Sequence, residues 1–109
     1  MNNTLDTLHH IAIEVKDIAT AIAWYTQHLH CTVSYQDDSW GLLKFANISV
    51  AFVLPGSHPP HIGISTEHPE HYGTPKDHRD GTASVYIPDP FGNWVEMIKL
   101  ASSERGQVK

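Results

Sequence analysis

The sequence predicts an α+β domain built from two related βαβββ modules, of which the second is reduced and lacks its helix. Two observations predict it. Short segments that alternate apolar and polar residues surround one amphipathic helix, and two patterns of the first half recur in the same order in the second half. A chain of 109 residues suits one domain with one core. We therefore expect a single domain over residues 1–109.

The first module is expected over residues 8–54. Its opening strand, 8–15, places Ile11 and Ile13 on one face, and Asp17 follows as the N-cap of an amphipathic helix that ends near His30. The apolar residues of this helix recur at spacings of three and four, so the helix can cover the isoleucine face. Short strands separated by turn-forming residues are expected over 32–36, 40–45 and 48–54.

The second module is expected over residues 61–100, after a linker at 55–60 that is rich in turn formers. It opens with a strand at 61–65. The polar stretch 66–81 has no helical periodicity and is predicted to be a loop in place of the second helix. A terminal hairpin is expected from strands at 83–87 and 94–100, and the tail 101–109 is expected to fray.

An internal repeat supports the two modules. His10-Ile11-Ala12-Ile13 resembles His61-Ile62-Gly63-Ile64, and Phe45–Leu54 aligns without gaps on Phe91–Leu100. The alignment places His10 and His61 at equivalent positions near the start of each opening strand. Both histidines alternate with the isoleucines and therefore share the other strand face with small or polar residues, as the lining of a cavity would.

The candidate site combines His10, His61 and Glu96. Glu96 shares a strand face with Trp94 and Ile98, and an unpaired carboxylate is costly in such an apolar setting. Two imidazoles and one carboxylate on rigid strands form a facial triad, which holds a divalent metal and leaves coordination positions open for substrate. The alternatives are hydrogen-bonded structural histidines and a glutamate that faces solvent.

These residues resemble the vicinal oxygen chelate superfamily, the group of glyoxalases, bleomycin-resistance proteins and extradiol dioxygenases. The resemblance covers about residues 8–100. It rests on the two opening strands, on Ile22-Ala23-Trp24-Tyr25 with Leu29, and on the closing segment Asp89–Glu96. It implies that His10, His61 and Glu96 bind Fe(II), Mn(II), Ni(II) or Zn(II), and that a small substrate chelates this cation through adjacent oxygens.

The resemblance also has departures. The repeat places Val50 opposite Glu96, and residues 48–54 contain no acid, so the usual base of a glyoxalase I type isomerase is missing. This favours dioxygenase-like or ring-opening chemistry over isomerisation, and a lyase or glyoxalase-like reaction stays open. His30 stands where the family generally has glycine. Tyr86 matches the position of a substrate-facing catalytic tyrosine, although a half-buried strand aromatic is an equally good interpretation.

Two functions of other classes remain open. One is a metal-free binding protein of the bleomycin-resistance kind, which sequesters a planar ligand in a groove lined by Trp40, Trp94 and Tyr86. The other is a degenerate module that serves only in assembly. Among other signals, His68 and His71 form a His-x-x-His pair that, with Asp77 and His78, requires a helix to bind metal. Because Pro69 opposes a helix, solvated loop histidines are the expected outcome.

Composition excludes several partners. The net charge is −5 and the basic residues are scattered, so neither nucleic acid nor a membrane surface is an expected partner. The single cysteine, Cys31, and the absence of a signal-peptide pattern favour a cytoplasmic protein. The reduced second module leaves a metal cup incomplete and strand edges exposed, so we expect a homodimer.

Overall fold

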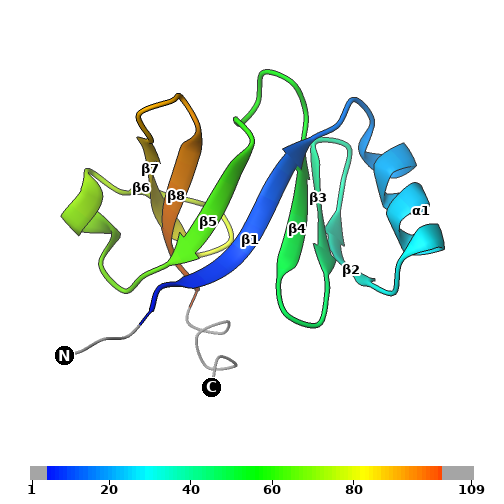
Figure 1. Cartoon of the computed structure of the whole chain (residues 1–109), viewed down its shortest axis with the longest axis horizontal. Helices are drawn as coiled ribbons and strands as arrows, with labels where there is room; N and C mark the ends of the chain where they lie inside the picture. The colour runs from blue at the N-terminus through cyan, green and yellow to red at the C-terminus, as the bar shows by residue number, and fades with distance from the viewer. Residues whose placement is uncertain (1–4, 102–109) are drawn as a thin grey trace. The chain divides into compact units, whose positions relative to one another are not determined.

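In the computed structural model, residues 5–101 are described, and they form one α-helix, one 3₁₀ helix and eight strands (Figure 1). This confirms the predicted α+β class. The chain divides into two compact units. One comprises residues 9–62, and the other comprises the described residues before 9 and from 63 onward. The single domain over 1–109 stays a prediction.

The unit of residues 9–62 has the expected βαβββ order. The elements are β1 (Thr7–Glu14, which begins in the other unit), α1 (Ile18–His28), β2 (Thr32–Gln36), β3 (Trp40–Lys44) and β4 (Ser49–Val53). In space the strands follow the order β2-β3-β4-β1, with β1 parallel to β4 and the other pairs antiparallel. The parallel pair is possible because α1 and the two strands after it form the long crossover that such a pair needs.

Helix α1 covers one face of these strands. The carboxylate of Asp17 accepts a hydrogen bond from the backbone N–H of Thr20 at 3.1 Å, which confirms the predicted N-cap. Ile18 and Ile22 are buried against Leu43 and Phe52. The partly buried residues that pack on this cluster include Ile13 and Val15, as the strand pattern predicts.

The close approach of α1 depends on a glycine in β3. A Cβ at Gly41 would lie 3.0 Å from Cδ1 of Ile22 and 3.2 Å from Cγ2 of Ile18. The helix ends at His28, two residues before the expected His30. Its C-cap residue, Leu29, is extended with φ −130°, so the helix end needs no left-handed residue. A histidine at position 30, where the family generally has glycine, is therefore compatible with this helix end.

The opposite face of the same strands carries small and aliphatic residues. Ala12, Ala51 and Val53 are buried together, with Leu42 packed against them. In the register of β1 and β4, His10 lies opposite Ser49, and Ala12 lies opposite Ala51. Since directly paired residues share a sheet face, His10 lies on the face that α1 does not cover.

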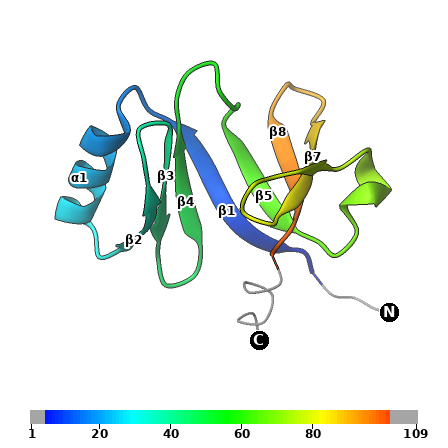
Figure 2. The same cartoon turned by 180° about the vertical axis from the view of Figure 1, so that it is seen from behind.

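The second unit has no α-helix among its described residues, as the reduced module predicts. Its elements are β5 (His61–Ser65, which begins in the other unit), the 3₁₀ helix η1 (Pro69–Tyr72), β6 (Lys76–Asp77), β7 (Ala83–Pro88) and β8 (Trp94–Lys99) (Figure 2). The prediction of a loop over 66–81 is therefore wrong in two places. Pro69 occupies the first position of η1, where its fixed φ favours a helical turn, and β6 pairs with β7.

The hairpin of β7 and β8 is fixed by its turn. Asp89 accepts hydrogen bonds from the side chain and backbone N–H of Asn93 and from the backbone N–H of Phe91, and these hold the pKa of the Asp89 carboxyl below its usual value. Gly92 supplies the left-handed residue, with φ +87°. The turn sets the register in which Tyr86 of β7 lies directly opposite Glu96 of β8.

Fraying is expected over 101–109, and all of these residues except Ala101 lie outside the described residues. Within the described part of the chain, no helix has the length and apolar character that crossing a bilayer requires.

Candidate functional site

Two buried histidines meet within the unit of residues 9–62. His10 of β1 is 7% exposed, and His61 at the start of β5 is 8% exposed. Their Nε2 atoms lie 3.0 Å apart, and their rings are nearly perpendicular with centroids 5.1 Å apart. The structure thus brings together the two imidazoles that the internal repeat pairs.

The outer nitrogens of both rings also have partners. Nδ1 of His61 lies 2.7 Å from the backbone oxygen of Pro59. Because a carbonyl oxygen only accepts, Nδ1 of His61 carries a proton, and the neutral ring presents an Nε2 lone pair toward His10. Nδ1 of His10 lies 2.8 Å from Nδ1 of His9, with the two rings again perpendicular. Each candidate ligand ring is therefore held at its Nδ1 atom.

The spacing of the two Nε2 atoms fits a shared cation. Two imidazoles that bind one metal at about 2.0–2.1 Å, in adjacent coordination positions, have nitrogens about 2.9–3.4 Å apart. The observed 3.0 Å lies in this range. Metal-bound histidines also commonly donate from their other nitrogen to a carbonyl, as His61 does toward Pro59. The residues present fit a divalent transition metal.

The second unit holds a carboxylate and a phenol side by side. Glu96 is 5% exposed and is followed by the buried Met97 and Ile98. Burial raises the pKa of Tyr86, and the negative charge of Glu96 and a hydrogen bond to it raise the pKa further. The Tyr86 hydroxyl therefore stays protonated at neutral pH. It can donate a hydrogen bond but cannot act as a general base.

The structure thus forms two pairs from the four predicted site residues: His10 with His61, and Tyr86 with Glu96. The pairs belong to different units. That Glu96 joins the two histidines on one cation remains a hypothesis. The sequence reading missed His9 and Pro59. The only sequence signals for them are a histidine adjacent to His10 and a proline-rich segment before His61.

The strand register shows that a base from β4 would have to stand next to Val50 and not at Val50 itself. Val50 lies opposite Ile11 and packs on the helix side of the strands, so it does not share a face with His10. The residues of β4 on the His10 face are Ser49, Ala51 and Val53. None of these is acidic, so β4 still offers no carboxylate base on that face.

The other residues that the sequence suggests for a site have different partners in the structure. His68 and His71 are exposed, as expected, but they lie at the helical turn η1, where their ligand atoms come close to Glu70. Nε2 of His78 instead lies 2.8 Å from the Ser84 hydroxyl oxygen. Trp40, expected in a ligand groove, stacks on Tyr35 with ring centroids 4.8 Å apart.

A sequence model of the glyoxalase/bleomycin resistance protein/dioxygenase superfamily matches residues 7–73. Among curated proteins, none matches the chain significantly.

Solved structures match the fold over nearly the whole chain. Methylmalonyl-CoA epimerase from Mycobacterium tuberculosis gives a TM-score of 0.76 at 16% identity, over 97% of this chain and 96% of that one. A methylmalonyl-CoA epimerase in complex with methylmalonyl-CoA and NH4+ gives a TM-score of 0.69 at 14% identity, over 91% of this chain and 97% of that one. A superfamily member from Vibrio splendidus 12B01 gives a TM-score of 0.68 at 11% identity, over 88% of this chain and 100% of that one. At these identities the likeness is one of fold.

Proposed function

Because the chain belongs to the glyoxalase/bleomycin resistance protein/dioxygenase superfamily, we propose that it is a divalent-metal-dependent enzyme in which His10, His61 and Glu96 hold the cation. The observation that carries the proposal is the buried pair of imidazoles, whose Nε2 atoms are 3.0 Å apart. A cation satisfies both lone pairs at once. It also balances the negative charge of the buried Glu96 carboxylate.

The substrate class that we propose is the one that the family resemblance implies. Three protein ligands leave coordination positions open, and a small molecule with two adjacent oxygens fills two of them. When bound, Fe(II), Mn(II), Ni(II) or Zn(II) supplies a Lewis acid that stabilises negative charge on a substrate oxygen.

The chain's own residues have distinct roles in this proposal. His10 and His61 bind as neutral imidazoles, and Pro59 orients the second of them. Glu96 lowers the net charge of the centre. Tyr86, protonated at neutral pH, donates a hydrogen bond to an oxygen of the Glu96 carboxylate or of the substrate.

The reaction class we favour is dioxygenase-like or lyase-like. Isomerisation by proton transfer needs a base, and the face of β4 that carries Ser49, Ala51 and Val53 provides no carboxylate. The two epimerase structures share the fold at 16% and 14% identity, which does not carry their reaction over to this chain.

Metal analysis tests the proposal. Wild-type protein, His10→Ala and Glu96→Gln are loaded with Zn(II) or Fe(II), desalted and assayed for bound metal. His28→Ala, at an exposed histidine on α1, is the control. We expect about one tightly held equivalent in wild type and His28→Ala, and its loss in the other two variants. Equal metal content in all four proteins would remove the proposal. Retention in Glu96→Gln alone would remove Glu96 from the ligand set.

A ligand-binding test separates the metal-free alternative. A catechol serves as a probe with two adjacent oxygens, and its binding is followed by tryptophan fluorescence. A metal-dependent enzyme binds the probe only before chelator treatment. Quenching that survives the chelator would identify a metal-free binding protein of the bleomycin-resistance kind instead.

We further propose a cytoplasmic homodimer. All five residues of the edge strand β2 are exposed, Val33 to 45% and Tyr35 to 40%, and exposed edges favour pairing with another chain. Sedimentation velocity at micromolar concentration tests the assembly, and a single monomeric species would contradict it.

A further inference from the structure

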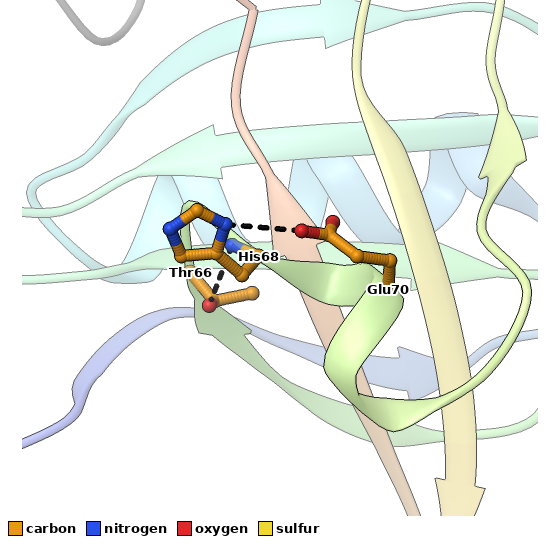
Figure 3. Close-up of polar contacts among 3 residues, drawn as sticks. All are labelled: Thr66, His68 and Glu70. Atoms are coloured by element: carbon orange, nitrogen blue, oxygen red, sulfur yellow. Dashed lines mark hydrogen bonds and ion pairs between the residues drawn. The ribbon is translucent and has the colours of Figure 1, made fainter.

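Three metal-binding side chains gather on the surface at η1, within the second unit. His68, Glu70 and His71 each offer one ligand atom, and these atoms all lie within 4.8 Å of one another. Nδ1 of His68 lies 3.0 Å from a carboxylate oxygen of Glu70, as Figure 3 shows. The rings of His68 and His71 are stacked, with centroids 4.9 Å apart and planes at 16°.

The backbone arranges these side chains before any ligand arrives. The backbone N–H of His68 donates to the Thr66 hydroxyl oxygen at 3.1 Å (Figure 3), and the N–H of His71 donates to the carbonyl of His68 at 3.1 Å. Pro69 is fully buried and starts the turn. In 3₁₀ geometry, residues three apart lie one above the other, which explains why His68 and His71 share a face. The buried proline thus anchors a turn whose other side chains point to solvent.

We propose that His68, Glu70 and His71 form a second metal site, independent of the buried histidine pair, that binds Cu(II), Zn(II) or Ni(II). Two imidazoles and one carboxylate suit these borderline cations, whereas Mg(II) and Ca(II) prefer ligand sets made only of oxygen. Water completes the coordination, because the three side chains are exposed.

Closing the site requires only small movements. Ligand atoms on one cation are about 3 Å apart, and the side chains of His68 and Glu70 are 62% and 54% exposed, so they can rotate to bring the three ligand atoms to that spacing. The same exposure limits the affinity, since the charges stay hydrated and exposed ion pairs are weak. The proposal therefore predicts weaker binding than at the buried pair.

Isothermal titration of chelator-treated protein with Zn(II) tests the site. We expect two binding events in wild type. His71→Ala weakens the second event at least tenfold and leaves the tighter event unchanged, and Glu70→Gln weakens the second event less. The control His28→Ala changes neither event. Mg(II) in place of Zn(II) gives no second event.

A second measurement locates the cation. In the His10→Ala background, where the buried pair no longer competes, substoichiometric Cu(II) is expected to broaden the amide NMR signals of residues 66–73, and of far fewer of these residues when His71→Ala is added. Unchanged Zn(II) titrations and unchanged broadening in His71→Ala would overturn the proposal. In His10→Ala, the tighter event should be lost and the second event should remain. The titrations therefore test the buried pair and the surface site separately.

Discussion

Replacing His9 is expected to weaken the buried metal site without touching a ligand. For His10 to offer its Nε2 lone pair to a cation, the ring proton must reside on Nδ1. That atom lies 2.8 Å from Nδ1 of His9, which must then accept the hydrogen bond. His9→Leu removes the acceptor. His9→Asn keeps one, because the side-chain oxygen of asparagine can occupy nearly the same place as Nδ1.

The size of the effect follows from the contact. His9 is half-buried, so solvent replaces its hydrogen bond only in part. Loss of an outer hydrogen-bond partner of a metal ligand typically costs about 10–100-fold in metal affinity. This corresponds to about 1.4–2.8 kcal/mol at 1.4 kcal/mol per tenfold. We expect a value near the lower end for His9→Leu, because water can still reach a half-buried nitrogen, and less than threefold for His9→Asn.

Competition with a chromophoric chelator measures the Zn(II) dissociation constant of each variant, with His28→Leu as the matched surface control. The orienting role of His9 would be refuted if His10→Ala loses the metal while His9→Leu keeps the wild-type Zn(II) dissociation constant. If His10→Ala also keeps its metal, the error lies in the proposed centre itself.

Four further outcomes are expected. Tyr86→Phe lowers the unfolding free energy of metal-free protein by about 1–3 kcal/mol, because buried Glu96 loses a donor; urea denaturation measures this, and an unchanged midpoint contradicts it. Gly41→Ala places a Cβ 3.0 Å from Cδ1 of Ile22, and the resulting overpacking costs about 1–3 kcal/mol, more than the roughly 0.4–1 kcal/mol gained by restricting the unfolded chain. Thermal denaturation at or above the wild-type midpoint would be the contrary result. The lowered pKa of Asp89 stabilises the fold above its unfolded value of about 3.9, and this contribution is lost as pH falls through the lowered pKa. In urea denaturation, wild type and Asp89→Ala should therefore differ at pH 7, and the difference should shrink as the pH falls below about 3.9. Chelator should lower the melting temperature of loaded wild type, by the equivalent of about 2.7 kcal/mol for metal at 100 times its dissociation constant, but not that of His61→Ala.

Much of the fold could be predicted because local signals and tertiary packing agree. Alternation places Ile13 toward α1, and Asp17 has the side chain that an N-cap needs. The turn η1 could not be predicted in this way. Four residues are too few to show a helical period, and Pro69 was read as a helix breaker although proline favours the first helical position.

The internal repeat predicts which histidines of the candidate site come together, but it does not predict the side-chain contacts around them. The repeat pairs His10 with His61. His9 escapes such reasoning because neighbouring strand residues point to opposite faces, so the pattern groups it with Ile11. The contact between His9 and His10 is made by ring edges, which strand periodicity does not describe. Likewise, a gapless alignment assigns Val50 to Glu96, but strand register decides which face a residue occupies.

The partners of the ring nitrogens distinguish the proposed ligand His61 from other histidines among the nine in this chain. His28 also has its Nδ1 next to a carbonyl, that of Trp24 at 2.8 Å, yet it is exposed, so water can satisfy its other nitrogen. His78 directs Nε2 at a hydroxyl oxygen. His61 combines what the others lack: burial, a proton held on Nδ1 by an acceptor-only partner, and an Nε2 lone pair aimed at another imidazole. In metal-free protein, Nε2 of His61 can accept a proton from Nε2 of His10. A cation would engage both Nε2 atoms, and the ring proton of His10 would then reside on Nδ1, where Nδ1 of His9 accepts it.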